Sequence, residues 1–530
     1  MEFKHIRDLI NQGQAAEALA ELKKIKAQTE LNDATENMWE LHELFGAAFH
    51  GLGDAEGVAQ AYWAAAQADK YLRTQREHYS SYLFALHYLS GIAEKELALQ
   101  HLAYGNLYAP AVVENWGDNT DTNLMQGQGA ASPFKQRTDA LASCESLMQS
   151  QWGLGQSPNI YDSPLRVGYL TPALRDDAAA RFYECLLTAC DREKFKVYCY
   201  YLAGGEDEFA RRVAQNATCR DLSDLSLADA AALIKRDSLD ILVDLGGHAS
   251  GGLTLMIMSY RPAKTQISGI GWFDTTGLAA MDYLWGDAYL RPSSPEFITE
   301  KLLALPQAFC FVPDGQTKKA AARLAAKADD NSPVVFGSFN NFLKLSDEIL
   351  SLWREILLKL PQARLLLKDT SPIPARKKSL LTRLKTKDFP LDRVEIRLGT
   401  REYLTELSAV DIVLDTWPYP GGAMTCTALS LGIPVAARLG ERYGSRFADS
   451  LFMAAGKSEW LAKDAADYIN LAVKLGSEPE KYRTQRGRLA ADVAASPLFN
   501  VERYMRGVET VYEQLSLRGE ASCPCINARS

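Results

Sequence analysis

"LDTWPYPGGAMTCTALSLGIPV", residues 414–435, contains three sequence patterns in succession. An apolar run that begins at Asp411 leads into a turn rich in proline and glycine, and small residues at helical spacing follow. Such a turn leaves backbone N–H groups bare at Gly421 and Gly422, and these groups can bind a phosphate together with the positive end of a helix. The segment therefore predicts a strand, a phosphate-binding loop and a helix, although a tight turn uses the same residues.

The same alternation of strand and helix patterns continues on both sides of this segment. Short runs rich in β-branched and aromatic residues begin near positions 166, 196, 240, 266 and 282, and again near 334, 364, 394, 411 and 433. Strands that alternate with helices indicate parallel sheets with crossover helices. We therefore expect an α/β protein with two Rossmann-like domains, residues 164–318 and 319–497, in which ligands bind at the carboxyl ends of the strands.

The first part of the chain is expected to be helical throughout. Segments 11–25 and 51–65 each contain a turn glycine followed by alanines and large apolar residues at helical spacing. Gly13 and Gly53 align when one segment is shifted by 40 residues, which is longer than the usual tetratricopeptide period of about 34. We assign residues 1–111 to an all-α, tetratricopeptide-like domain, which is either a generic helical cap or an arm that recruits a substrate.

Three further segments complete the expected organisation. Residues 112–163 are polar and rich in turn residues, which predicts a linker with one helix over 135–151. Residues 498–516 carry one apolar stripe and predict an amphipathic helix. Residues 517–530 are polar and are expected to be disordered.

Composition excludes several classes of function. The chain has 530 residues, 47% of them hydrophobic and 23% charged, as in a folded water-soluble protein. A net charge of −8 argues against nucleic-acid binding. The start of the chain lacks the apolar core of a secretory signal. The sequence contains no run of about 18 apolar residues, so no membrane span is expected. The nine cysteines are scattered, which indicates reduced thiols and a cytoplasmic location.

Two ionisable side chains follow expected strands. Six of the seven histidines lie at or before His101, whereas His248 follows the strand near 240 and stands among glycines. An imidazole there can accept or donate a proton near neutral pH, or it can be structural. Lys344 follows the strand near 334, where an ammonium group can neutralise a diphosphate, although a surface lysine would give the same pattern.

The residues also bear on metal use. Asp415 ends the strand near 411 and could accept hydrogen bonds from ribose hydroxyls. The α/β part contains no Asp-x-Asp pair. If the protein transfers a sugar, cationic side chains and helix dipoles would have to stabilise the departing diphosphate without a metal.

The chain resembles the O-GlcNAc transferase family, glycosyltransferase family 41. Residues 80–109 are similar to the junction between the family's helical repeats and its catalytic half, and six segments follow in the family's order: RVGYLTPALRDD, DLGGHASGG, YRPAKTQISGIGWFDTTGLAAMDY, NNFLK, LDTWPYPGG and SPLFNVERY. The resemblance covers roughly residues 80–516. It implies a GT-B fold after the tetratricopeptide-like domain, a UDP-sugar donor, no metal or other cofactor, inversion at the anomeric carbon, and a protein acceptor in the cytoplasm.

The resemblance also implies roles for individual residues. Lys344 matches the diphosphate-binding lysine, Asp415 a ribose contact, and Tyr403 a ring that stacks on uracil. The other donor-binding positions are a polar contact, the phosphate loop and two residues near the sugar: Asn341, Gly421, Gly422, Thr425, Thr275 and Thr276.

The sequence departs from the family at several positions. Asp177 and Arg181 stand where the family has two histidines, and Tyr443 stands where it often has another. Asp177 could replace a histidine as a base, act electrostatically, or be a solvated loop carboxylate. Ala423 and Met424 replace threonines of the phosphate loop, and each lost hydrogen bond to a charged group costs about 1.5–3 kcal/mol, which can change donor affinity or identity.

Our hypothesis from the sequence is an inverting, metal-independent glycosyltransferase. It would transfer a hexose or N-acetylhexosamine from a UDP-sugar to a protein side chain, with a Ser/Thr hydroxyl favoured over an Asn amide. His248 or Asp177 would assist proton removal, and the N-terminal helices would hold the acceptor polypeptide. The alternatives are a weak or inactive member that acts as a binding or partner subunit, and a GT-B enzyme with a non-protein acceptor.

Overall fold

A computed structural model describes residues 2–31, 38–108, 163–324 and 332–517. The chain divides into two compact units. The first unit comprises residues 1–92 and 309–501, and the second comprises residues 93–308 and 502–530. Each unit is described by itself.

The second unit is built on a seven-stranded sheet with the order β3-β2-β1-β4-β5-β6-β7. All its strand pairs are parallel, as predicted. The strands are β1 Leu165–Thr171, β2 Phe195–Tyr201, β3 Thr218–Asp221, β4 Ile241–Asp244, β5 Thr265–Ser268, β6 Tyr283–Gly286 and β7 Lys301–Ala304. The strand order reverses between β1 and β4, and ligands of doubly wound sheets bind beyond the carboxyl ends of strands at such a point.

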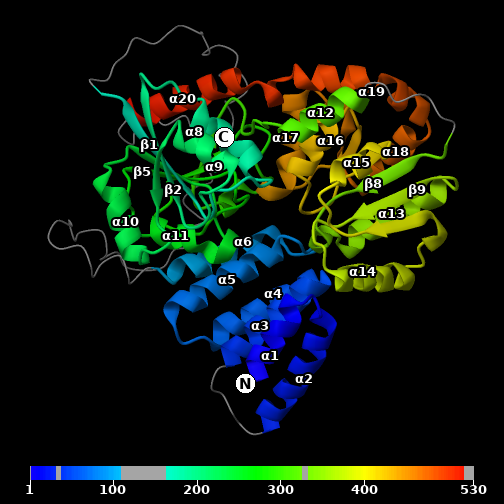
Figure 1. The fold of residues 1–530 in the computed structure, drawn as a ribbon, viewed down its shortest axis with the longest axis horizontal. Helices are drawn as coiled ribbons and strands as arrows, with labels where there is room; N and C mark the ends of the chain where they lie inside the picture. The colour runs from blue at the N-terminus through cyan, green and yellow to red at the C-terminus, as the bar shows by residue number, and fades with distance from the viewer. Residues whose placement is uncertain (1, 32–37, 109–162, 325–331, 518–530) are drawn as a thin grey trace. The chain divides into compact units, whose positions relative to one another are not determined.

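Helices that are distant in sequence complete the second unit (Figure 1). They are α6 Glu94–Asn106, α8 Ala180–Thr188, α9 Glu208–Ala214, α10 Leu227–Arg236 and α11 Leu253–Met258, together with nearly all of α20, Val501–Leu517. The hydroxyl of Tyr512 on α20 lies 3.1 Å from that of Tyr169 on β1, and the Tyr504 hydroxyl donates to the Ala308 carbonyl at 3.1 Å. The last described helix therefore packs against the start of the α/β region.

The first unit contains a six-stranded parallel sheet with the order β10-β9-β8-β11-β12-β13. Its strands are β8 Val335–Ser338, β9 Arg364–Lys368, β10 Val394–Arg397, β11 Ile412–Leu414, β12 Val435–Arg438 and β13 Leu461–Ala462. Its α/β helices are α12 Gly315–Leu324, α13 Asp347–Lys359, α14 Pro374–Thr386, α15 Tyr403–Ser408, α16 Ala423–Ser430, α17 Phe447–Ala455, α18 Ala465–Gly476 and α19 Pro479–Ala494. Here the strand order reverses between β8 and β11.

Five N-terminal helices, which we call the helical block, also belong to the first unit. They are α1 Glu2–Asn11, α2 Ala15–Leu31, α3 Met38–Leu52, α4 Ala55–Ala68 and α5 Leu72–Leu86. Ala18, Leu22, Leu44 and Ala48 are among the buried residues of their shared core. The residues of this core come from α1 to α4, whose apolar side chains recur at helical spacing, as in packed helical hairpins.

The two aligned glycines of the helical block have the same backbone role. Gly13 ends the turn between α1 and α2 at φ +76°, and Gly53 lies between α3 and α4 at φ +71°. Both lie close to the start of α14: a Cβ on Gly13 would be 3.7 Å from Cγ2 of Ile373, and one on Gly53 would be 3.5 Å from Nε of Arg376. The repeat seen in the sequence therefore corresponds to two equivalent turns that contact the α/β part of this unit.

The compact units group the chain differently from the domains expected from the sequence. Helix α6 falls within the expected domain 1–111 but belongs to the second unit. The domain boundaries stay predictions. The helix expected over 135–151 and nearly all of the expected tail 517–530 lie outside the described residues.

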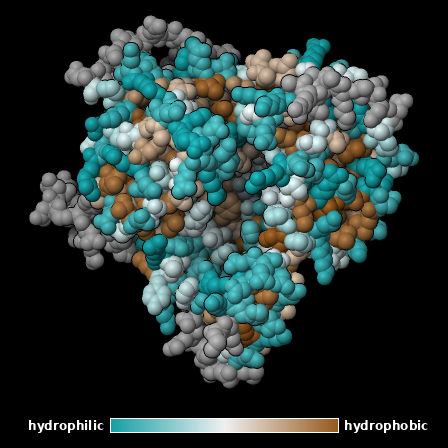
Figure 2. All heavy atoms as spheres, in the orientation of Figure 1, coloured by the Kyte–Doolittle hydropathy of each residue, from teal (hydrophilic) through white to brown (hydrophobic). Residues whose placement is uncertain are grey.

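The surface contains few large exposed hydrophobic side chains. Trp63, Tyr71 and Leu72 of the helical block are among them. Figure 2 shows hydrophobic residues on the visible face in patches separated by hydrophilic ones. In the part of the chain that the structure describes, no helix has both the length and the hydropathy needed to cross a membrane.

Candidate functional site

The loop after β11, residues 415–422, is organised by the carboxylate of Asp415, and we call it the Gly421 loop. Asp415 is 1% exposed. Its Oδ1 accepts the N–H groups of Gly421 at 2.7 Å and Thr416 at 2.9 Å, and its Oδ2 accepts a long 3.4 Å hydrogen bond from Oγ1 of Thr425. Burial raises the pKa of Asp415 to about 6, although these donors oppose the shift. The carboxylate closes the loop and accepts the N–H of Gly421, so the prediction that this N–H is bare for a phosphate is wrong. The contact of Asp415 with a ribose stays a prediction.

Close packing explains the glycine at position 421. A Cβ there would lie 2.7 Å from Oγ1 of Thr425 and 2.8 Å from Oδ1 of Asp415. Gly422 precedes α16 and makes no side-chain cap, so the first N–H groups of this helix are not capped by that residue. A helix start of this kind suits an anion. Ala423 and Met424, which replace the expected threonines, are the first two residues of α16 and are partly exposed.

Lys344 lies beside this loop although it is more than 70 residues away in sequence. It ends a 3₁₀ helix, η4 Phe342–Lys344, that follows β8, and β8 pairs with β11. The Lys344 ammonium donates to the Pro420 carbonyl at 2.9 Å and lies 3.8 Å from the ring centroid of Tyr419. Burial lowers the pKa of Lys344 to about 8, although the Asp415 carboxylate opposes the shift. The lysine is therefore still mainly charged at pH 7, as an anion site requires.

Asn341 links the lysine segment to an arginine that the sequence analysis missed. Its Oδ1 accepts the N–H of Leu343 at 3.0 Å and a short hydrogen bond from Arg376. Arg376 comes from α14, is 1% exposed, and forms a 2.7 Å ion pair with Asp369 at the end of β9. Asn341 thus has a structural role in this unit, and its contact with a donor stays a prediction.

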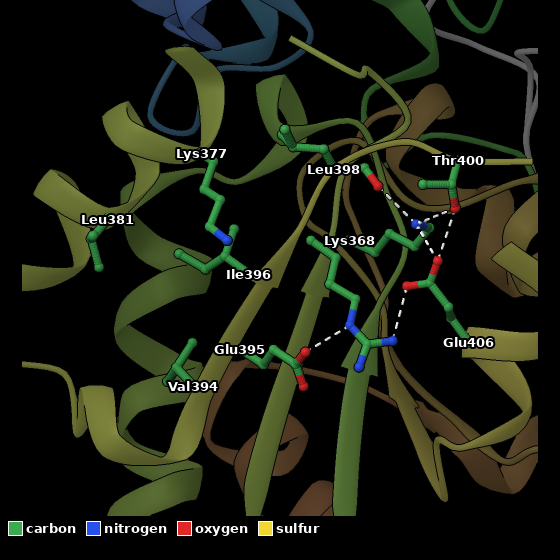
Figure 3. Close-up of a pocket in the computed structure, with 10 residues that line it drawn as sticks. Lys368, Lys377, Leu381, Val394, Glu395, Ile396, Leu398, Thr400 and Glu406 are labelled. Carbon is green, nitrogen blue, oxygen red and sulfur yellow. Dashed lines mark hydrogen bonds and ion pairs between the residues drawn. The ribbon is translucent and has the colours of Figure 1, made fainter. Parts of the chain in front are cut away.

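Tyr403, expected to stack on uracil, is the first residue of α15 and is partly exposed. Near α15 the first unit has a pocket of about 550 Å³ beside β10 (Figure 3). Lys368 lies in this pocket and donates to Leu398, Thr400 and Glu406 at 2.7, 2.9 and 2.7 Å. None of the residues predicted to bind the donor lines the pocket. Its buried lysine is already paired, so the pocket does not identify the anion site.

In the second unit, His248 lies at the end of a loop that a second aspartate organises. Asp244 at the end of β4 accepts the N–H groups of Gly246 at 2.9 Å and Gly247 at 2.8 Å. His248 is 1% exposed, and its ring contacts those of Tyr104 and Trp272 at centroid distances of 4.6 and 4.7 Å. Burial lowers the pKa of His248 well below its usual range. The imidazole is therefore neutral at pH 7.

Thr275 and Thr276, predicted to lie near the sugar, are buried. Their hydroxyls donate to the buried carboxylate of Glu300 at 2.7 and 2.5 Å, and the N–H of Thr276 donates to it at 2.7 Å. Glu300 was not found from the sequence because it follows an unremarkable loop 25 residues after Thr275. The threonines therefore have a structural partner, and their contact with a sugar stays a prediction.

Asp177 lies in the loop between β1 and α8 and is partly exposed. Its Oδ1 accepts the N–H groups of Ala179 and Ala180, each at 3.0 Å, so it caps the start of α8. Arg181 is buried and forms an ion pair with Asp176. Because β1 and β4 pair in parallel, the loops that carry Asp177 and His248 leave the same edge of the sheet.

Metal-binding side chains do not cluster in the described parts of either unit. Within residues 2–31, 38–108, 163–324 and 332–517, no group of three or more His, Cys, Asp or Glu side chains is arranged to hold a metal ion.

Comparisons with known proteins give consistent results. The model of the family described as Glycosyl transferase family 41 matches residues 140–332 and 321–508. A protein of Hordeum vulgare named "Probable UDP-N-acetylglucosamine--peptide N-acetylglucosaminyltransferase SPINDLY" is 29% identical over 379 residues, which are 69% of this chain and 40% of that protein. The Arabidopsis thaliana protein of the same description named SEC is 27% identical over 361 residues, 66% of this chain and 36% of its own length. The chain thus spans well under half of the curated relatives it matches.

A solved structure of a mutant O-GlcNAc transferase from Thermobaculum terrenum is similar over most of the chain. The two are 26% identical with a TM-score of 0.76, and the match covers 96% of this chain and 88% of the other. This similarity confirms the predicted fold class, a GT-B fold of two Rossmann-like domains preceded by an all-α tetratricopeptide-like domain.

Proposed function

Because the chain belongs to glycosyl transferase family 41, we propose that it transfers a sugar from a UDP-sugar to a protein side chain. The observation that carries this proposal is the convergence of Lys344 with the Gly421 loop at the ends of two paired strands. The names of the relatives, which describe N-acetylglucosamine transfer to peptides, support the same donor and acceptor classes. N-acetylglucosamine is accordingly the first sugar to test.

The donor half of the mechanism is electrostatic. The Lys344 ammonium and the N–H groups at the start of α16, which Gly422 does not cap, are placed to stabilise negative charge on the departing diphosphate. A cation and a helix terminus can supply this stabilisation without a metal, so we propose a metal-independent reaction.

The transfer itself is proposed to be a single displacement with inversion. The acceptor oxygen attacks the anomeric carbon, the bond from that carbon to the diphosphate oxygen breaks, and its electron pair leaves with UDP. The acceptor proton passes to a base, for which the neutral imidazole of His248 and the carboxylate of Asp177 are the candidates. Oδ1 of Asp177 already accepts two N–H groups, and aromatic rings enclose His248, so both stay candidates for the base.

A Ser or Thr hydroxyl is the favoured acceptor, with an Asn amide as the alternative, and we propose that the reaction takes place in the cytoplasm. The helical block is proposed to hold the acceptor polypeptide. The second candidate function is a binding subunit without turnover, which is favoured by Ala423 and Met424 at the start of α16 because they provide no hydroxyl to a diphosphate.

The test combines ligand binding with turnover. Thermal unfolding is measured with a panel of UDP- and GDP-sugars, since a ligand of the folded state raises the melting temperature. UDP release is then measured with cell-lysate protein as acceptor, in the wild type, in Lys344→Ala and in the control Lys377→Ala, an exposed lysine of the separate pocket.

We expect stabilisation by a UDP-sugar and a UDP release that Lys344→Ala lowers by about 100-fold to 1,000-fold and Lys377→Ala leaves unchanged. Stabilisation without release would favour the binding subunit. Stabilisation only by GDP-sugars would refute the proposed donor, and a loss of release of less than about tenfold in Lys344→Ala would refute the role of the lysine.

A further inference from the structure

An aromatic stack connects the helical block to the lysine of the proposed diphosphate site. Tyr88, in the turn after α5, is 8% exposed and stacks on Tyr419 with a centroid distance of 5.3 Å and an interplanar angle of 20°. The Tyr419 ring in turn lies 3.8 Å from the ammonium of Lys344. All three residues belong to the first unit. Only the Tyr419 ring thus separates Lys344 from Tyr88, which closely follows the last helix of the helical block.

Further contacts fix Tyr419 in this position. Phe84 on α5 lies 6.3 Å from the Tyr419 ring and 5.7 Å from that of Tyr88, so two rings of the helical block contact the loop. In addition, the Thr416 hydroxyl donates to the Tyr419 carbonyl at 2.7 Å. The next carbonyl, that of Pro420, accepts the Lys344 ammonium. The Tyr419 ring, its own carbonyl and the carbonyl of Pro420 therefore each have a partner.

The helical block also contacts the segment that carries Lys344. Arg376 donates to the His50 carbonyl in the last turn of α3 at 3.4 Å, while it pairs with Asp369. A Cβ on Gly53 would lie 3.6 Å from Cβ of Phe342, the first residue of η4, which ends at Lys344. The helices therefore contact both segments from which the diphosphate-binding groups come.

We propose that Tyr88 is a positioning residue for the nucleotide diphosphate. It holds the Tyr419 ring against Lys344 and so couples the helical block to the affinity for the donor, in addition to any contact of these helices with the acceptor. The inference rests on the proposed function, because it concerns the same diphosphate site. A cation is attracted to the face of an aromatic ring, so a ring held in place also fixes the ammonium. Without Tyr88, the Tyr419 ring gains room to turn away.

The first experiment measures UDP affinity by titration calorimetry on the full chain. Tyr88→Leu should bind UDP roughly fivefold to tenfold more weakly than the wild type. Tyr88→Phe keeps the ring and should stay within about twofold of the wild type. The matched control is Tyr79→Leu, which removes a different buried tyrosine, on α5, whose ring neighbours include Trp63 and Tyr82. Melting temperatures of all variants report loss of fold.

A double-mutant cycle separates positioning from general destabilisation. If Tyr88 acts through Lys344, Tyr88→Leu should weaken UDP binding no further when Lys344 is already alanine. An undiminished effect in that background, or an equal effect of Tyr79→Leu, would overturn the inference. Unchanged UDP affinity in Tyr88→Leu would overturn it too, while wild-type binding would leave the proposed function standing. A wild type that fails to bind UDP would instead refute the proposed function, and the inference with it.

Discussion

The two α/β parts use one backbone arrangement with two different electrostatic results. Each sheet has one point at which the strand order reverses, and a buried aspartate stands at the end of a strand next to that point. This aspartate accepts N–H groups from the glycine-containing loop that follows it. These residues are Asp244 after β4 and Asp415 after β11, and burial raises the pKa of each to about 6. The Asp244 loop leads to His248, whereas the Asp415 loop contacts Lys344.

The difference lies in what surrounds the ionisable neighbour. Aromatic rings enclose His248 and keep it neutral, while Lys344 lies at the face of one ring and near a carboxylate that favours its charge. The backbone geometry that the two loops share therefore does not determine the charge of the ionisable side chain beside each loop. The Asp244 loop leads to a neutral imidazole, and the Asp415 loop accepts a hydrogen bond from a lysine of another segment.

The largest effect is expected from removing the cation that lies beside the Gly421 loop. Lys344→Ala should lower kcat/KM for UDP-sugar about 100-fold to 1,000-fold, because a preorganised charge that stabilises the leaving group is removed. Steady-state kinetics of UDP release measure this effect. Lys377→Ala serves as the control, and a loss of less than tenfold would mean that the loop does not rely on this cation.

The two glycine loops should respond differently to an added methyl group. Gly247 has φ +54°, and a Cβ there would lie 2.1 Å from Cβ of Trp272, so Gly247→Ala should lower the free energy of unfolding by about 2–4 kcal/mol. At Gly421 the methyl group would meet the side chains of Asp415 and Thr425, so Gly421→Ala should mainly weaken UDP binding. Chemical denaturation and calorimetry distinguish the two, and equal stability losses would contradict this contrast.

A pH titration separates the charged side chain from the neutral one. In the proposed role Lys344 binds a diphosphate in its protonated form, so UDP affinity should fall as pH rises through the pKa of about 8, by at most about tenfold per pH unit. Lys344→Arg should remove this dependence, because arginine stays charged. Burial lowers the pKa of His248, so its protonation should cause no loss of turnover near pH 6.5. UDP affinity that is constant from pH 7 to 9.5 would refute the alkaline prediction.

The smallest expected effect comes from a comparison of two threonines, one in each unit. Thr276 donates to Glu300 at 2.5 Å, whereas Thr425 donates to Asp415 at 3.4 Å. Thr276→Val should therefore lower the free energy of unfolding by about 1–3 kcal/mol, and Thr425→Val by less than about 1 kcal/mol. Urea denaturation measures both values. A larger loss of unfolding free energy in Thr425→Val than in Thr276→Val would show that the lengths of the two hydrogen bonds do not predict their contributions to stability.

The sequence predicted the interior of both sheets better than their edges. The ten expected strands correspond to β1, β2, β4, β5, β6 and β8 through β12. The missed strands β3, β7 and β13 each lie at an edge. An edge strand pairs on one side only, so it can be short and polar: β3 is the sequence TCRD, and β13 has two residues. Apolar runs, on which the prediction depended, mark strands that are covered on both faces.

Within the candidate site, strand ends were predictable and tertiary partners were not. Lys344 and the Gly421 loop were found because each follows an apolar run. Arg376 stands in the basic run ARKK and resembles its exposed neighbours, although it is in helical phase with the buried Leu380 and Leu384. This helical spacing could have predicted that Arg376 is buried. Tyr88 gave none, since its role depends on a ring 331 positions away.

The turns at Gly13 and Gly53 limit how far the helical block can be treated as an interchangeable module. Both turns contact the region around the start of α14, one at Ile373 and the other at Arg376. Adding or removing a hairpin between them would bring a different turn to one of these contacts. The number of repeats is therefore tied to the α/β part of the first unit, and a longer array is best added ahead of α1 or combined with a redesigned α14.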